Sequence, residues 1–167
     1  MDLVAIEEIK RLKHRYFRTL DLKKWEEFGD CLSEDVTARY GTQAMEKPVH
    51  FDTRADVVAF MSENLGPGVI TAHIANHPEI DVDGDSAQAS WVFEDTVLVP
   101  DFQMQIRGVG YYLDAYRKDP DGAWRISSTQ YERIYEAKTS LNDTPSFELI
   151  ANRWDPSLRR QVISLQP

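Results

Sequence analysis

The spacing of apolar residues changes near residue 66 of this chain. Before that point, apolar residues recur every three or four positions, which is the period of an amphipathic helix. From residue 69 to residue 139, apolar and polar residues alternate, which is the period of a strand with one buried face. The pattern therefore predicts helices in the first half of the chain and a sheet in the second half.

Three helices are expected, and local signals mark their ends. Asp2 and Thr53 are suitable N-caps for the first and third helices, and Gly66-Pro67-Gly68 ends the third. On the first helix the charged residues fill the face opposite the apolar stripe. The expected helices are 3–20, 22–32 and 53–65, with a short strand over 36–42 between the last two.

Four long strands follow, joined by tight turns. The Asp-Gly pairs at residues 83–84 and 121–122 are typical of hairpin turns. Since these strands exceed the usual length of five or six residues, we expect bulges and strong curvature. The expected strands are 69–82, 86–99, 103–118 and 123–139. The order of elements predicts an α+β fold, a curved antiparallel β-sheet that forms a cone and is covered by three helices from the N-terminal half. The concave side of such a sheet leaves room for a pocket.

Composition limits the possible functions. The length of 167 residues indicates one domain, and the formal net charge of −9 argues against binding to nucleic acid or to an anionic membrane surface. The single cysteine, Cys31, forms no intramolecular disulfide and is expected to be a buried structural thiol. No apolar run approaches membrane-spanning length, so a cytoplasmic protein is expected.

Four polar residues lie at positions that should face the core. Tyr16 is on the apolar stripe of the first helix, Asp21 follows that helix, and His73 and Asp95 lie in consecutive strands. A ladder centred on the turn near Gly84 places His73 opposite residue 95 or 96, so His73 and Asp95 are expected to be cross-strand neighbours. A carboxylate that binds one imidazole nitrogen makes the other nitrogen a base, and the pattern therefore predicts catalytic roles for Tyr16, Asp21, His73 and Asp95.

These residues also have structural interpretations. A histidine in a strand is often a satisfied core residue, and Asp21 could instead cap the second helix. A metal site shared by His73 and His77 is not expected, because residues four apart in a strand lie roughly 13 Å apart. No metal and no cofactor is predicted.

Aromatic residues are unusually frequent in the sheet region. Most must belong to the core, but the surplus suits a pocket for a flat apolar ligand. Gly108 and Gly110 alternate along one strand, which could leave room for that ligand or permit curvature. The aromatic residues expected to bind substrate are Tyr40, Phe93, Phe102 and Tyr112.

Three segments carry a resemblance to a known family, namely IEEIKRLKHRYFRTLDLKKWEEF, TAHIANHPEIDVDGDSAQASWVFED and DGAWRISSTQYERIYE. They resemble the SnoaL-like branch of the nuclear transport factor 2-like superfamily, and within it the bile acid 7α-dehydratases and, more distantly, the scytalone dehydratases. The resemblance implies a cone-shaped homotrimer that eliminates water without a cofactor. It also implies functional positions at Tyr16, Asp21, Tyr40, His73 and Asp95, and a substrate-binding role for Arg133, where the related enzymes also have an arginine.

The leading hypothesis is a dehydratase acting on a hydroxylated, carbonyl-activated ring compound such as a steroid or bile acid. An isomerase, a cyclase or an epoxide hydrolase on the same fold is an alternative, and so is a non-catalytic binding or assembly module. A homo-oligomer is expected, with a trimer favoured over a dimer. Residues 1–140 are expected to form the domain, and 141–167 a tail that packs on the domain or on a neighbouring subunit.

Overall fold

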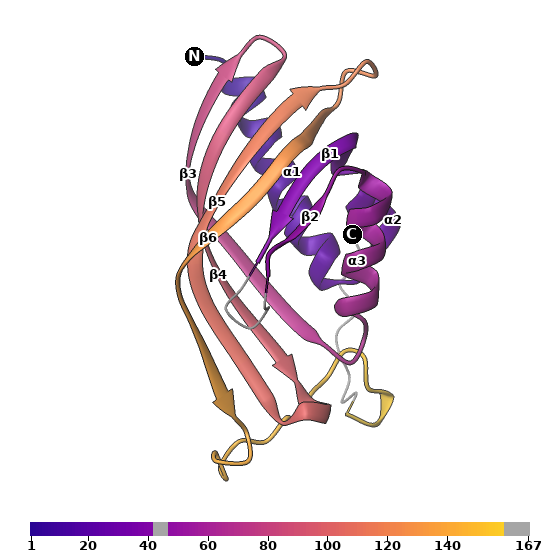
Figure 1. Cartoon of the computed structure of the whole chain (residues 1–167), viewed down its shortest axis with the longest axis vertical. Helices are drawn as coiled ribbons and strands as arrows, with labels where there is room; N and C mark the ends of the chain where they lie inside the picture. The colour runs from indigo at the N-terminus through magenta and orange to yellow at the C-terminus, as the bar shows by residue number, and fades with distance from the viewer. Residues whose placement is uncertain (42–46, 159–167) are drawn as a thin grey trace.

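A six-stranded curved sheet with helices on one face forms the molecule (Figure 1). The computed structural model describes residues 1–41 and 47–158. The strand order is β2-β1-β6-β5-β4-β3. The elements are α1 (Leu3–Asp21), α2 (Trp25–Gly29), β1 (Leu32–Tyr40), β2 (Val49–Phe51), α3 (Arg54–Asn64), β3 (Ile70–Asp83), β4 (Ser86–Val99), β5 (Met104–Lys118), β6 (Trp124–Ser140) and the short 3₁₀ turns η1 (Pro100–Phe102) and η2 (Pro156–Leu158). The expected α+β cone with its curved sheet is confirmed.

The four long strands and two of the helices begin and end within a residue or so of the predicted positions. Asp2 accepts hydrogen bonds from the amides of Val4 and Ala5, and Thr53 accepts one from Asp56, so both predicted N-caps are present. These ends were predictable because a capping side chain satisfies amides that the first turn of a helix leaves unpaired.

The second helix and the first strand differ from the prediction. The helix is only five residues long, and β1 begins at Leu32, four residues earlier than expected. The amide of Ile126 in β6 donates to the carbonyl of Cys31, and Leu32 pairs with Ile126. Pairing with β6 therefore replaces the helix over the residues where the helical pattern continues. This β1–β6 pairing is parallel, whereas the four long strands pair antiparallel, as expected. The three-residue strand β2 was not predicted, and residue 42 of the predicted strand lies outside the described residues.

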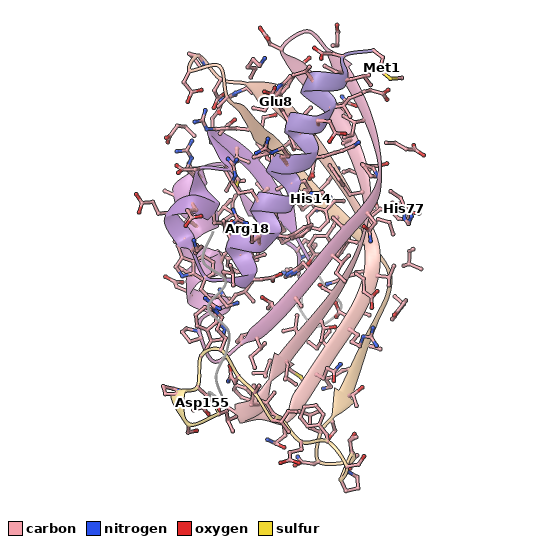
Figure 2. The ribbon with its side chains drawn as sticks, turned by 180° about the vertical axis from the view of Figure 1, so that it is seen from behind. Met1, Glu8, His14, Arg18, His77 and Asp155 are labelled. Atoms are coloured by element: carbon pink, nitrogen blue, oxygen red, sulfur yellow. The ribbon has the colours of Figure 1, made fainter. Side chains whose placement is uncertain are left out.

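A bulge in β3 fixes the register of the functional residues. Asn76 pairs with Val92 and Glu79 pairs with Ser90, so His77 and Pro78 together oppose one residue of β4. His77 has a φ of 48°, and Figure 2 shows its side chain projecting away from the molecule at the edge formed by β3. Because the extra residue shifts the pairing by one, His73 lies directly opposite Asp95, as predicted.

Helix α1 lies across the inner face of the sheet and buries one charged residue (Figure 2). Lys13 is fully buried, and its ammonium lies 2.7 Å from a carboxylate oxygen of Asp114 in β5. Asp114 also accepts hydrogen bonds from Tyr116 and Thr129. Burial lowers the pKa of Lys13, and Asp114 opposes that effect. The expectation that the charged residues of this helix all face away from the core is therefore wrong for Lys13, because a buried carboxylate provides its counter-ion.

The segment after β6 starts with a buried residue, Leu141, and continues mainly through turns to Leu158. Residues 159–167 of the expected tail lie outside the described residues. Its packing on the domain or on a neighbouring subunit stays a prediction. Among the described helices, none combines the length and the hydropathy needed to cross a membrane.

Candidate active site

A largely apolar cavity of about 280 Å³ lies between the helices and the inner face of the sheet. Its described lining comes from Leu20 of α1, the end of α3 and five strands of the sheet, namely β1, β3, β4, β5 and β6. Three polar or charged residues of the sheet, His73, Asp95 and Arg133, open into it. The described residues that line the cavity are Leu20, Tyr40, Phe60, Met61, Asn64, Leu65, His73, Phe93, Asp95, Val97, Tyr112, Tyr131 and Arg133.

Asp21 holds His73 in one orientation. Its Oδ1 lies 2.7 Å from Nδ1 of His73, and its Oδ2 accepts the His73 backbone amide at 2.9 Å. Thr71 donates a further hydrogen bond to Oδ1 at 2.8 Å. Phe17 stacks on the imidazole with ring centroids 5.1 Å apart. Since a carboxylate accepts hydrogen bonds, Nδ1 carries the proton and Nε2 of the neutral ring is left as a base.

This arrangement corrects two predictions about the carboxylates. The orienting partner of His73 is Asp21 and not Asp95, whose Oδ2 lies 3.9 Å from Nε2. Asp21 also does not cap α2, which starts after Lys24 without a side-chain cap. The side chain of Asp21 instead accepts a hydrogen bond from Thr71 of β3, because the last residue of α1 lies beside that strand.

Asp95 pairs with Arg133 instead. The guanidinium donates two hydrogen bonds, of 2.8 and 2.7 Å, to the two carboxylate oxygens. Arg133 also lies over the rings of Phe93 and Tyr131, at 4.8 and 5.1 Å from their centroids, and its Nε lies 3.5 Å from Glu136. Burial alone would lower the pKa of Arg133, but the bonds to Asp95 outweigh it and raise that pKa. The charge of Arg133 is thus balanced inside the protein.

Gly108 makes room for this pair, and Gly110 makes room for the ring of Phe93 and the backbone of β6. A Cβ at Gly108 would lie 2.5 Å from Nη1 of Arg133, and one at Gly110 would lie 2.8 Å from the ring of Phe93. Gly108 is the direct β5 neighbour of Asp95. Arg133 therefore reaches across β5 to Asp95 over a position that has no side chain, and Arg133 rather than a ligand occupies that space.

Two tyrosines form a hydrogen-bonded pair beside the cavity. The hydroxyls of Tyr16 and Tyr40 lie 2.9 Å apart. Tyr40 lines the cavity, whereas Tyr16 is fully buried behind it and is not among the described lining residues. Burial raises the pKa of both phenols. They remain protonated donors, so Tyr16 can reach a ligand only through Tyr40.

The sequence pattern of the SnoaL-like domain family matches residues 1–130. The chain belongs to this family. Its structure resembles a Novosphingobium aromaticivorans protein that carries the name scytalone dehydratase, with 21% identity, a TM-score of 0.72, and coverage of 81% of this chain and 88% of that one. It also resembles a hexachlorocyclohexane dehydrochlorinase of type 2, with 14% identity, a TM-score of 0.71, and coverage of 82% and 90%. A Catenulispora acidiphila protein solved in complex with S-DNPA matches with 20% identity, a TM-score of 0.64, and coverage of 79% and 95%. These likenesses establish the fold.

In this SnoaL-like domain the predicted binding residues Tyr40, Phe93, Tyr112 and Arg133 line the cavity, but Phe102 does not. Phe102 is 78% exposed in the η1 turn between β4 and β5. Of residues 97–108, only Val97 is among the described residues that line the cavity. The chain turns back at Gln103, which has a φ of 47°, and this turn lies beyond the cavity.

Sequence reasoning missed the contribution of α3. Phe60, Met61, Asn64 and Leu65 line the cavity, and three of them belong to the apolar stripe that predicted the helix. The stripe could have predicted these lining residues, because the last turn of the helix comes directly before the strand that carries His73. Tyr131 of β6 is a further lining residue that was not among the residues predicted to bind substrate.

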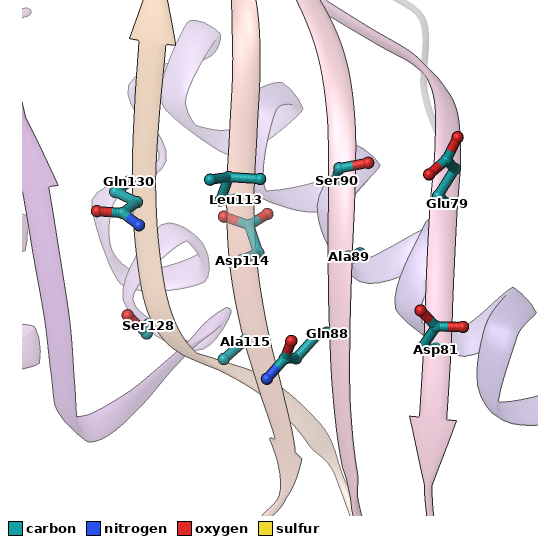
Figure 3. Close-up of a pocket in the computed structure, with 10 residues that line it drawn as sticks. All are labelled: Glu79, Asp81, Gln88, Ala89, Ser90, Leu113, Asp114, Ala115, Ser128 and Gln130. Carbon is teal, nitrogen blue, oxygen red and sulfur yellow. The ribbon is translucent and has the colours of Figure 1, made fainter.

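A second hollow, of about 440 Å³, lies on the outer face of the sheet (Figure 3). Figure 3 shows side chains from four neighbouring strands, including Glu79, Asp81, Gln88 and Gln130. It contains carboxylates and amides but no histidine, cysteine or lysine among its described lining residues. The inner cavity is therefore the candidate active site. Within 1–41 and 47–158, no group of three or more His, Cys, Asp or Glu side chains is arranged to hold a metal ion.

Proposed function

We propose that this protein is a cofactor-independent lyase that eliminates water from a hydroxylated, carbonyl-activated ring compound. The observation that carries the proposal is His73, whose Nδ1 is bound to Asp21 while the ring opens into an apolar cavity. A base held in this way contributes about 10²–10⁴-fold to the rate of a proton transfer.

The proposed reaction is a stepwise elimination. Nε2 of His73 removes the proton from the carbon next to the carbonyl, and the carbonyl oxygen takes up the electron pair as an enolate. Tyr40 donates a hydrogen bond to that oxygen, with Tyr16 behind it. As the enolate collapses, the carbon–hydroxyl bond breaks and a carbon–carbon double bond forms. The proton held by His73 passes to the leaving hydroxide, which departs as water.

The cavity favours a neutral substrate. Arg133 is already paired with Asp95, so the described residues that line the cavity offer no unbalanced cation for an acidic group. The volume of about 280 Å³ lies just below the usual range of ligand pockets, roughly 300–1,000 Å³, which suits one or two rings. A steroid or bile acid would place its reacting ring inside and extend the rest beyond the cavity. The names of the dehydratase and dehydrochlorinase neighbours both describe eliminations, which supports this reaction type.

The test compares the wild type with His73→Gln on a panel of β-hydroxy ketones with one to four rings. We expect a product lighter by one water and a loss of about 10²–10⁴-fold in kcat/KM for the variant. If the wild type converts none of the panel, or His73→Gln matches it, the proposal is wrong.

An isomerase is the second candidate. The same base and the same enolate would serve if His73 returned its proton to another carbon instead of to a leaving hydroxide. Product mass separates the two, because isomerisation leaves the mass unchanged. Cyclases and epoxide hydrolases would appear in the same product analysis.

We further propose a cytoplasmic homo-oligomer, with a trimer favoured over a dimer. The buried thiol of Cys31, whose pKa burial raises to about 11, suits a reducing compartment. Exposed apolar residues on the sheet suit a subunit contact.

A further inference from the structure

A lysine is connected to the catalytic base through a chain of hydrogen bonds. The ammonium of Lys23 donates to the hydroxyl of Thr71 at 3.1 Å. That hydroxyl donates to Oδ1 of Asp21 at 2.8 Å, and the same oxygen lies 2.7 Å from Nδ1 of His73. Lys23 is half-buried, so this contact is shielded from solvent more than a surface pair would be.

The backbone of Lys23 adopts a conformation that does not suit a lysine. Its φ is 58°, in the left-handed region, directly after the end of α1. The amide of Lys23 donates to the carbonyl of Leu20, and the amide of Lys24 donates to that of Thr19. This is the helix ending in which glycine is usual at the left-handed position. A lysine gains nothing from the local backbone there, which points to a role for its side chain.

The charges around His73 explain what that role is. Asp21 and Asp95 face the imidazole, Phe17 covers one ring face, and Glu136 lies behind Arg133. Arg133 neutralises Asp95. Lys23 is the cation on the Asp21 side. Burial lowers the pKa of Lys23 to about 8, with Asp21 opposing the shift, so the ammonium is charged over the range in which a histidine titrates.

We infer that Lys23 is a positioning residue that balances the charge of Asp21 and so limits the pull of that carboxylate on a proton at the His73 ring. The inference rests on the proposed role of His73 as the base. Without Lys23, the carboxylate of Asp21 would attract a proton to the ring, and a protonated imidazole cannot accept the proton of the substrate.

The experiment is an NMR titration of the His73 ring in the wild type and in Lys23→Met, Lys23→Gly and Lys23→Arg. The signal is assigned by its loss in His73→Gln. In the Met and Gly variants we expect the titration midpoint to move to higher pH by roughly half to one unit, whereas Arg preserves it. Lys23→Gly removes the charge but supplies the residue that the helix end favours, so its Tm should equal or exceed that of the wild type.

Lys24→Met is the matched control, because Lys24 pairs with Glu27 at the surface and its removal changes the net charge equally. The inference is overturned if the midpoint stays in place in Lys23→Gly, or if Lys24→Met moves it as far. The titration needs no substrate, so a failure of the proposed reaction does not affect it. Where turnover is found, the acidic limb of the pH profile of kcat/KM should shift together with the midpoint of the His73 titration.

Discussion

Asp21 accepts three hydrogen bonds, and two of them come from His73. An asparagine of the same shape would keep the geometry but remove the charge, and its amide could turn a donor toward Nδ1. We therefore expect Asp21→Asn to fold normally, to lower kcat by about 10²–10⁴-fold, and to lose the tautomer protonated on Nδ1. Nitrogen-15 NMR of the ring reports the tautomer.

Asp52→Asn is the control for that variant. Asp52 lies 2.9 Å from Nε2 of His50 in an exposed pair, so the substitution changes a second Asp–His contact outside the cavity. It should leave turnover and the His73 tautomer unchanged. Equal losses in both variants would contradict the assignment of Asp21.

The pair formed by Asp95 and Arg133 makes a different prediction, one about stability. Removal of Arg133 leaves a buried carboxylate without a counter-ion, so Arg133→Met should lower the free energy of unfolding by about 3–5 kcal/mol. Urea denaturation measures the loss. Arg107→Met, which breaks the exposed pair with Glu94, should cost little. If the free energy of unfolding falls by the same small amount in both variants, the buried pair does not stabilise the fold as proposed.

At the residue scale, the sequence predicted which side chains meet but not how they pair. Strand parity and the turn position placed His73 beside Asp95. Their actual partners come from elsewhere: Asp21 from the end of α1, and Arg133 from a strand two places away in the sheet. Such partners depend on the crossing of a helix and a sheet, which local periodicity does not specify. Lys23 carried a signal only as a lysine at a position that usually holds glycine.

Gly108 lies where the Asp95–Arg133 pair crosses the paired strands. It lies on β5 between Asp95 of β4 and Glu136 of β6, and Arg133 fills the space where its side chain would stand. Gly108→Ala should displace the guanidinium and cost about 1–3 kcal/mol in unfolding free energy. Gly66→Ala is the control, since its nearest atom would be 3.8 Å away. Equal stability of the two variants would show that the space over Gly108 is not required.

At the element scale, the long strands were predictable because their period-two pattern runs for 14 to 17 residues. Segment 22–32 was not, because an apolar residue every three or four positions fits a short helix followed by a strand as well as one longer helix. The pairing of Leu32 with Ile126, 94 positions apart, decided that case. The three residues of β2 are too few to show any period.

At the scale of the whole molecule, the helices cover one face of the sheet and leave the other exposed (Figure 1). Five large apolar side chains of β3, β5 and β6 are exposed there or at its strand ends, namely Ile74, Tyr111, Leu113, Ile134 and Tyr135. Exposed apolar side chains on a sheet face that the helices leave uncovered are typical of a subunit contact. The proposed trimer should therefore depend on this group.

Leu113→Asp places a charge in that group and tests the trimer. Leu113 is 45% exposed on the outer face, so the folded chain should tolerate the substitution, but a subunit contact should not, because it would bury an unpaired carboxylate. We expect sedimentation equilibrium to give three times the chain mass for the wild type and the mass of a single chain for the variant. Val4→Asp is the control, since Val4 is 71% exposed in the first turn of α1, where a carboxylate is favourable. A wild type that sediments as a monomer, or a variant that stays trimeric, would rule out this subunit contact. If the wild type is a dimer and Leu113→Asp dissociates it, this surface is the subunit contact but the trimer is rejected.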